Sequence, residues 1–310
     1  MDMSVLSTNT SACKGTKKQS VPFITLDSSG VVGDAHRGPG LRQVSILSSE
    51  IIDSFARQTG QTFQSGDFAE NITTSGLDLR NVAILDRLRI AGTELEIAQI
   101  GKECHGKGCA IFNEVGACIM PNDGIFCRVT AGGKIKTGDT ITHVETPLMM
   151  KIITLSDRAA RGEYEDLSGP AIRRILEGFF SGKRYRLAIT QALIPDDGER
   201  LRNEVLAACS EGVAAVFTTG GTGIGPRDIT PDVLSPLLEK QLAGPMEYVR
   251  QKYAERNPAV LLSRSIAGVR GHTMIFAMPG SPKAIADYME VISSILLHAM
   301  QMVRGVDSHH

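Results

Sequence analysis

The sequence lacks an excess of charge of either sign. Lysine and arginine number 33 and aspartate and glutamate 34, so the formal net charge is −1. Proteins that bind nucleic acid or an anionic membrane through charge carry a basic patch that raises the overall balance. We therefore expect no nucleic-acid partner and no membrane partner. A small phosphorylated ligand fits this composition better than a polymer does.

Long apolar runs are also missing. No stretch reaches the ~20 residues that a membrane-spanning helix needs. The first residues, MDMSVLSTNTSACKGTKK, lack the apolar core of a signal peptide. We therefore expect a cytoplasmic protein. In a reducing compartment its six cysteines would be free thiols or ligands rather than disulfide partners.

One glycine-rich run is present, TTGGTG at 218–223, directly after the apolar and strand-like run 213–217. It is neither a Walker A loop, because no Gly-Lys-Ser/Thr follows, nor a dinucleotide Gly-x-Gly-x-x-Gly motif. Glycines can adopt positive φ and bring backbone N–H groups close to a phosphate, and the threonine hydroxyls add donors. The run therefore predicts a phosphate site at the carboxyl end of a strand. The predicted donors are Thr219, Gly220, Gly221, Thr222 and Gly223.

Two carboxylates, Asp228 and Asp232, follow this run. Like charges beside a phosphate site indicate a divalent metal or another positive group between them, and Mg²⁺ with a nucleotide is the simplest pair. Thr230 suits the N-cap and Pro231 the first position of the next helix, whose free N–H groups would attract an anion. Pro236 predicts that this helix is short or kinked. The alternative is a strand that turns through glycines into a helix without any ligand.

From Met150 onward strands and helices alternate. This pattern predicts an α/β fold with three layers, a mostly parallel sheet covered on both faces. The predicted strands are 151–156, 187–194, 213–217 and 273–278, and one helix is expected to be capped by Ser168. Loops at four strand ends would then meet at one edge of the sheet, and this convergence is what indicates a site. The alternative for each loop is a polar turn, which is the favoured interpretation for Ser156-Asp157 or Asp197 alone. These loops are Ser156-Asp157, Asp196-Asp197, the glycine-rich run and Pro279-Gly280-Ser281.

The segment from about Lys151 to Leu297 contains TLSDRAARGEYEDLSGP, IPDD, TTGGTGIGPRDITPD and MPGSPKAI in this order. It resembles the Mog-type molybdopterin-binding family, in which an adenylyltransferase activates molybdopterin with ATP. The resemblance implies an enzyme in which Asp196 and Asp228 are catalytic and hold Mg²⁺. Arg227 would be a countercharge or, equally well, a solvated arginine. The residues that the resemblance assigns to cofactor binding are Ser156, Thr219, Gly220, Gly221, Thr222, Gly223, Thr230, Gly280 and Ser281.

The first half of the chain has a different pattern. Short β-rich runs are separated by Gly, Asp and Asn turns, with one helix near 49–58, which predicts a β-rich, barrel-like domain. The predicted strands are 43–47, 72–74, 86–90, 93–100, 125–129 and 135–141. We expect this domain to cover 1–145 and the second domain 150–310, with a linker near Glu145–Leu148.

The stretches VVGDAHRG, RQVSIL, GDFAENITTSGLDL, IGKECHGKGCAI and KIKTGDTI resemble the MOSC domain. This family is associated with molybdenum cofactor binding and with sulfur carried on a cysteine. Leu41 departs from the polar residue expected before RQVSIL. The resemblance implies that Cys104 ligates the molybdenum of the cofactor or carries sulfur. Lys102, His105 and Lys107 would favour its reactive thiolate, and an inert thiol is the alternative.

Two further features of this half allow more than one interpretation. Cys104, Cys109, Cys118 and Cys127 form a C-x4-C-x8-C-x8-C series, which suggests a zinc or iron–sulfur site. The absence of a Cys-x2-Cys knuckle argues against such a site, and the strand-like surroundings of Cys127 indicate packing. For His36 the sequence allows two predictions: the side chain contacts a phosphate or a metal ion, or the residue is simply part of a turn.

These observations lead to one main hypothesis. The second domain adenylylates molybdopterin with ATP and Mg²⁺, and the first domain binds or modifies the later molybdenum cofactor. Joining the two steps on one chain would raise the local concentration of a labile intermediate. One alternative is a carrier or storage protein that binds the pterin without transfer. Another is that only the first domain is catalytic, through Cys104. The resemblance also implies a homotrimer and a molybdenum-insertion enzyme as a partner.

Overall fold

The computed structural model describes residues 3–102 and 118–305. Within these residues the chain forms two compact units. The first extends to Pro147 and includes Arg184–Arg186, and the second contains Leu148–Lys183 and the chain from Leu187 onward. None of the described helices combines the length and apolar character needed to cross a membrane. Cys104, His105, Lys107 and Cys109 lie outside the described residues.

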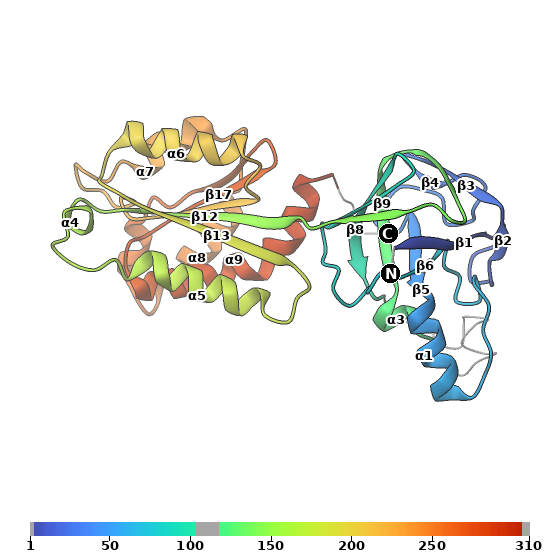
Figure 1. Cartoon of the computed structure of the whole chain (residues 1–310). Coiled ribbons are helices and arrows are strands. Elements are labelled where there is room, and N and C mark those ends of the chain that lie inside the picture. Colours follow the sequence, from blue (N-terminus) through green and yellow to red (C-terminus); the bar gives the residue numbers. More distant parts are fainter. Residues whose placement is uncertain (1–2, 103–117, 306–310) are drawn as a thin grey trace. The chain divides into compact units, whose positions relative to one another are not determined.

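The first unit is built from β-sheet, as its sequence pattern predicts (Figure 1). In the part of this unit that the structure describes, the helices are α1 (Ser49–Thr59) and the short α3 (Met120–Asp123). Most strand pairs are antiparallel, and β5 and β6 are parallel. The large sheet has the order β11-β7-β8-β9-β5-β6-β1-β2 and the small one β10-β3-β4. The strands are β1 (Ser4–Thr10), β2 (Gln19–Val21), β3 (Phe23–Asp27), β4 (Gly30–Val31), β5 (Val44–Ser48), β6 (Ile72–Ser75), β7 (Arg87–Ile90), β8 (Thr93–Ile100), β9 (Ile125–Ala131), β10 (Gly133–Lys136) and β11 (Ile141–Val144).

The large sheet curls, because β1 is bonded to the chain around the start of β11. The Val5 N–H donates to Asp139 O over 2.9 Å, and the Ile141 N–H donates to Met3 O over 2.8 Å. Apolar side chains from β5, β7, β8 and β9 fill the core, and they include Cys127, which is fully buried. Burial raises the pKa of the Cys127 thiol, so this cysteine is a packing residue, as expected.

The expected single strand 135–141 is wrong. It is divided between β10 and β11, which belong to different sheets. The division lies at Gly138, whose φ of +88° turns the chain and whose N–H donates to Val5 O over 2.8 Å.

The second unit is an α/β structure with three layers. In Figure 1, α6 and α7 lie on one face of the sheet, and α5, α8 and α9 lie on the other. The sheet has the order β13-β12-β14-β17-β16-β15, in which β12, β14 and β17 are parallel and β16 and β15 are antiparallel additions. Its elements are β12 (Pro147–Leu155), α4 (Asp157–Ala160), α5 (Ser168–Phe180), β13 (Arg186–Ile194), α6 (Gly198–Ser210), β14 (Ala215–Thr219), α7 (Thr230–Leu234), the 3₁₀ helix Ser235–Leu237, β15 (Lys240–Gln241), α8 (Ala243–Ala254), the 3₁₀ helix Pro258–Leu262, β16 (Ala267–Arg270), β17 (Thr273–Met278) and α9 (Pro282–Val303). The predicted mostly parallel sheet is thus confirmed.

Two expected helix caps are wrong. Ser168 does not cap α5, because the Asp166 carboxylate accepts the N–H of Ser168 over 2.8 Å and that of Gly169 over 3.1 Å. Thr230 does not cap α7 but is its first residue, and the cap position, Ile229, has no side-chain bond. In both cases a competing partner decides the outcome. The Thr230 hydroxyl donates to Gly220 O over 2.8 Å instead.

Candidate functional site

The glycine-rich run follows β14 and turns sharply between two neighbouring strand ends. Gly220 has a φ of +104° and Gly221 a φ of +62°. A Cβ atom on Gly220 would lie 2.3 Å from Leu155 O, and one on Gly221 would lie 2.7 Å from Thr230 Oγ1. Both the backbone conformation and the lack of space therefore require glycine here.

Threonine hydroxyls hold this loop in place. The Thr219 hydroxyl donates to Pro279 O over 2.9 Å, and the Thr230 hydroxyl donates to Gly220 O. Thr219 and Thr230 are fully buried, and Thr222 is buried as well. The hydroxyl groups of Thr219 and Thr230 therefore donate to backbone carbonyls of the protein rather than to a ligand. The Gly220 N–H is also engaged, because it donates to Met278 O over 3.0 Å, so the remaining predicted phosphate donors are the N–H groups of Gly221, Thr222 and Gly223.

Asp228 closes the loop at its far end. Its Oδ2 accepts the Gly225 N–H over 2.8 Å, and a Cβ atom on Gly223 would lie only 2.7 Å from the same oxygen. The Asp228 carboxylate thus packs against Gly223 and Gly225, which have no side chain in its way. This contact places a negative charge directly beside the run of backbone N–H groups.

A second pair of carboxylates joins β12 to β13. The Asp196 N–H donates to Asp157 Oδ1 over 3.0 Å, and the Asp157 N–H donates to Asp196 Oδ2 over 3.3 Å. Arg227 Nη1 lies 3.2 Å from Asp157 Oδ2. Asp196 and Asp228 are therefore connected through Asp157 and Arg227, and three of the predicted strand-end loops adjoin one another.

Two other carboxylates named by the sequence have local structural partners. Asp197 is the N-cap of α6 and accepts the Arg200 N–H over 2.9 Å. Asp232 is bonded to Arg264, with Nη1 2.8 Å from Oδ1, and this bond lowers the pKa of Asp232. Arg264, from a distant segment, thus supplies positive charge beside Asp232, and the Mg²⁺ that the sequence suggested beside Asp228 stays a prediction. No motif pointed to Arg264.

A cavity of about 430 Å³ opens beside the loop. Gly221, Gly223 and Asp228 line one side of it, and the start of α9 lines another. The loop after β17 is held against the glycine-rich run, because Gly280 packs on Gly220 and Gly280 O accepts the Ser168 hydroxyl over 2.6 Å. The fourth predicted strand end thus belongs to the same edge.

The helix terminus at the cavity is α9 rather than α7. Ser281 caps α9 by accepting the Ala284 N–H over 3.2 Å, and Ser281, Lys283 and Ala284 line the cavity. The 22 residues of α9 sustain a helix dipole, whereas α7 has only five. The anion site expected at the start of α7 stays a prediction, and the start of α9 is the helix terminus that lines the cavity. Sequence reasoning also missed Tyr253, Asn257, Lys283 and Tyr288, which line the cavity as well.

Ser156 lies at the end of β12. It is the N-cap of α4, because its Oγ accepts the Ala159 N–H over 3.2 Å, and the same oxygen is 3.1 Å from Tyr164 Oη. The Ser156 N–H also donates to Ile194 O over 2.9 Å. Ser156 thus fixes the start of the segment that carries Asp157.

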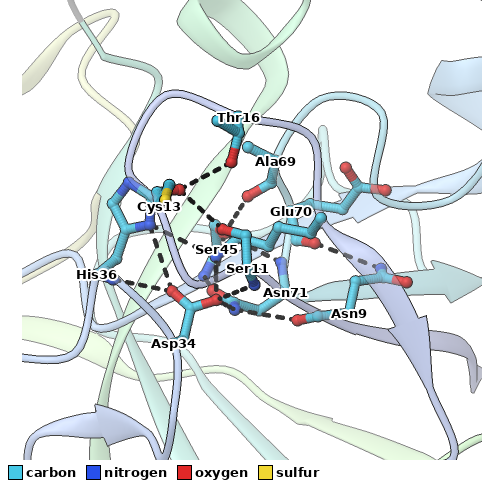
Figure 2. Close-up of polar contacts among 11 residues, drawn as sticks. Asn9, Ser11, Cys13, Thr16, Asp34, His36, Ser45, Ala69, Glu70 and Asn71 are labelled. Atoms are coloured by element: carbon cyan, nitrogen blue, oxygen red, sulfur yellow. Dashed lines mark hydrogen bonds and ion pairs between the residues drawn. The ribbon is translucent and has the colours of Figure 1, made fainter.

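The first unit contains a buried polar cluster around Asp34 (Figure 2). Its carboxylate accepts the Ser11 N–H over 3.1 Å, the His36 N–H over 2.9 Å and the Asn71 side-chain amide over 3.1 Å. It also pairs with Lys18, and both side chains are almost completely buried. Burial alone would raise the pKa of Asp34, but the bonds from His36 and Lys18 outweigh it and lower the pKa.

Two other groups of this cluster have different environments. The His36 ring is partly exposed, with Nδ1 3.3 Å from Asp34 Oδ1. Glu70 is fully buried, and burial raises its pKa, although Oε1 accepts the Thr73 hydroxyl over 2.9 Å. His36 thus belongs to an internal network and also presents an edge to solvent.

The two halves of the chain match different protein families. Residues 151–299 match the probable molybdopterin binding domain, and residues 33–142 match the MOSC domain. The molybdopterin adenylyltransferase of Pyrococcus furiosus is 35% identical over 166 residues, which span 52% of this chain and 95% of that protein. The chain belongs to the molybdopterin adenylyltransferase family. Both resemblances inferred from the sequence are thereby confirmed.

Two further proteins show similar sequence identity to this chain. The enzyme of Helicobacter pylori is 32% identical over 155 residues, covering 50% of this chain and 86% of that protein. Among solved structures, the molybdopterin biosynthesis enzyme MoaB of Thermus thermophilus is 36% identical, with a TM-score of 0.46, and the match covers 51% of this chain and 97% of that one. The family match at residues 151–299 lies in the second unit, and together with the two curated relatives it assigns the chain to molybdenum cofactor biosynthesis.

Proposed function

We propose that the second unit transfers an adenylyl group from ATP to molybdopterin. The observation that carries this proposal is the cavity that the glycine-rich loop, Asp228 and the capped start of α9 line together. Such an arrangement supplies backbone N–H groups and the Lys283 ammonium for binding phosphates. The Asp228 carboxylate beside them would repel a phosphate unless a cation lay between the two. The family of the second unit supports the same reaction.

In this reaction an oxygen of the terminal phosphate of molybdopterin attacks the α-phosphorus of ATP. A new P–O bond forms, the bond from that phosphorus to the β-phosphate oxygen breaks, and pyrophosphate leaves. Phosphoryl-type transfers depend on positioning and charge stabilisation more than on covalent catalysis. We assign the binding of the phosphates and the pterin to Ser156, Thr219, Gly220, Gly221, Thr222, Gly223, Thr230, Gly280 and Ser281, by N–H donation or by shaping the loops.

The carboxylates next to this loop suit Mg²⁺. This ion is commonly held by one or two carboxylates together with substrate phosphates, rather than by a complete protein cage. In the described part of the chain no group of three or more His, Cys, Asp or Glu side chains could hold a metal ion by itself. We propose that Asp228 and Asp196 hold Mg²⁺, which would neutralise phosphate charge. Arg227 would orient Asp157 and, through it, Asp196.

The test is pyrophosphate release after mixing the protein with molybdopterin, ATP and Mg²⁺. We expect release by the wild type and a loss of about 100-fold or more in Asp228→Asn, by analogy with the removal of one electrostatic group from an active site. Asp197→Asn is the matched control, since asparagine caps a helix as well as aspartate does. No release by the wild type, with molybdopterin bound, would instead favour a carrier or storage protein.

For the first unit we propose binding or modification of the molybdenum cofactor, with domains at 1–145 and 150–310. The match to the MOSC family supports this role, and Cys104 is the residue that we expect to ligate molybdenum or to carry sulfur. Cys104→Ser should abolish cofactor binding, whereas Cys13→Ser, at an exposed thiol of the same unit, should not. Unchanged binding in Cys104→Ser would contradict this role. The product of the second unit would pass to a molybdenum-insertion enzyme, and we propose a trimeric assembly.

A further inference from the structure

Arg264 bonds to both ends of the loop that carries Asp228. Its backbone N–H donates to Thr222 O over 2.8 Å, and its Nε donates to Gly223 O over 2.8 Å. Its Nη2 donates to Asp228 O and, over 3.0 Å, to Asp232 Oδ2. One residue therefore satisfies the carbonyls at the beginning and at the end of the loop 222–228.

The segment that carries Arg264 is itself anchored to two helices. The Tyr288 hydroxyl of α9 donates to Ser263 Oγ over 3.1 Å, and Ser263 Oγ lies 2.7 Å from Ser265 Oγ. Arg250 of α8 reaches Ser263 O and Ser265 O, each over 3.4 Å. The neighbours of Arg264 on both sides are thus held, so its side chain has a fixed base from which to hold the loop.

Only a guanidinium has the shape for these contacts. Its planar fork presents several N–H donors in fixed directions, so it can bond to two carbonyls and one carboxylate together. A lysine ammonium is a point charge and cannot reproduce this pattern. The bond to Asp232 also raises the pKa of Arg264, so the side chain is charged throughout the physiological range.

We infer that Arg264 is a positioning residue, which holds the loop 222–228 so that Asp228 and the loop N–H groups face the cavity in a fixed arrangement. The inference rests on the proposed adenylyl transfer for its effect on catalysis, but not for its effect on the loop. Because Asp228 is displaced when its backbone moves, loss of Arg264 should lower kcat. A misplacement of about 1 Å in a site can cost about 100-fold in rate.

The experiment compares Arg264→Ala with Arg264→Lys and with Arg173→Gln. Arg173 is a matched control, because it also bonds a carboxylate and a carbonyl, those of Glu177 and Ile189, away from the loop. We expect pyrophosphate release to fall about 100-fold in Arg264→Ala, mainly in kcat, and to be unchanged in Arg173→Gln. Guanidinium ion at millimolar concentration should restore part of the loss in Arg264→Ala, whereas sodium ion should not. Arg264→Lys should recover little.

Hydrogen exchange at the amides of 222–228 separates this inference from the proposed function. If the wild type releases no pyrophosphate, the proposed function fails. Faster exchange of these amides in Arg264→Ala, with unchanged exchange in α9, would still support the role of Arg264. Equal exchange in the two proteins would overturn it, as would a kcat equal to that of the wild type. Should Arg264→Ala not fold, Asp232→Asn removes one partner of the guanidinium on an exposed surface, and a smaller increase in loop exchange is expected there.

Discussion

The charged cluster around Asp34 in the first unit is buried, whereas the carboxylates at the strand ends of the second unit are partly exposed. Lys18 and Asp34 have side-chain exposures of 0% and 2%, while Asp157 and Arg227 have exposures of 25% and 72%. In the buried cluster the Asp34 carboxylate accepts bonds from other segments of the same unit as well as from His36 in its own turn. In the second unit Asp157 and Asp196 accept each other's backbone N–H groups, while Asp228 holds its own loop and lines the cavity.

This contrast separates structural charges from candidate functional ones. A buried pair is costly to disrupt, because one unpaired charge would remain in a low-dielectric interior. An exposed pair adds little to stability, since water already solvates its members. Charge substitutions in the buried Asp34 cluster should therefore lower stability, and substitutions of Asp196 or Asp228 should lower ligand binding or activity.

The largest expected effect is that of Asp34→Ala. The substitution would leave the Lys18 ammonium buried without its partner, and such losses cost about 3–5 kcal/mol. Denaturant unfolding of the full chain, followed by a probe in the first unit, measures it. Asp27→Ala is the control, because its pair with Arg37 is exposed and the unfolding midpoint should not move. An unchanged midpoint in Asp34→Ala would show that the buried pair of Asp34 and Lys18 is not needed for stability.

Gly220→Ala should rank next. The new Cβ atom would lie 2.3 Å from Leu155 O at a φ of +104°, so the loop must shift. We expect a loss of about 2–4 kcal/mol in unfolding free energy, from backbone strain and overpacking, together with loss of molybdopterin binding. Gly212→Ala, at a φ of +74° with open space around it, isolates the strain of positive φ from the clash. Equal effects of the two substitutions would show that space at Gly220 is unimportant.

Thr230→Val should have a smaller effect. It removes the hydroxyl that donates to Gly220 O and leaves that buried carbonyl without this partner, which costs about 1–3 kcal/mol. Thr230→Ser keeps the hydroxyl and should retain most of the stability. Thermal unfolding of both variants measures the difference. If serine and valine behaved alike, the hydroxyl bond would not be what holds the loop.

The smallest effect is a change in pH dependence. Burial raises the pKa of Glu70 above its ordinary 4.5, so its contribution to stability is complete below that value and is lost as the pH rises through the folded pKa. Asp34 has the opposite sign, because its pKa is lowered from 3.8, and its contribution is lost as the pH falls below that value. Glu70→Gln cannot ionise.

We therefore expect Glu70→Gln to become more stable relative to the wild type as the pH rises above 4.5 and through the raised pKa of Glu70. The free energy of unfolding at several pH values measures this. Asp53→Asn, at an exposed carboxylate of α1, serves as the control and should follow the wild type. A constant difference between Glu70→Gln and the wild type across this range would contradict the raised pKa.

The strands and helices of the second unit could be predicted well because apolar runs and turn residues alternate there. The predicted strand 273–278 agrees with β17 residue for residue. The first unit was harder. β1 has the largely polar sequence SVLSTNT, and its alternation is hidden because Asn9 and Thr8 are buried through side-chain hydrogen bonds. Whether the curled sheet is the predicted barrel stays a prediction.

The candidate site was predictable only in part. Motifs mark the loops at the strand ends, because the glycines and carboxylates lie within a few residues of each other in the sequence. Arg264 escaped notice because it is 36 residues from the Asp228 carbonyl to which it bonds, and no spacing relates the two. The same is true of Lys18 and Asp34, which are 16 residues apart, before β2 and after β4.

The reciprocal bonds between Asp157 and Asp196 have a consequence for natural variation at these positions. Each carboxylate accepts the backbone N–H of the other residue, so a substitution at either one alters two loops at once. The two positions should therefore be thermodynamically coupled, and the effect of the double substitution should be smaller than the sum of the two single ones. A lineage that loses one aspartate has already lost most of what the other one contributes.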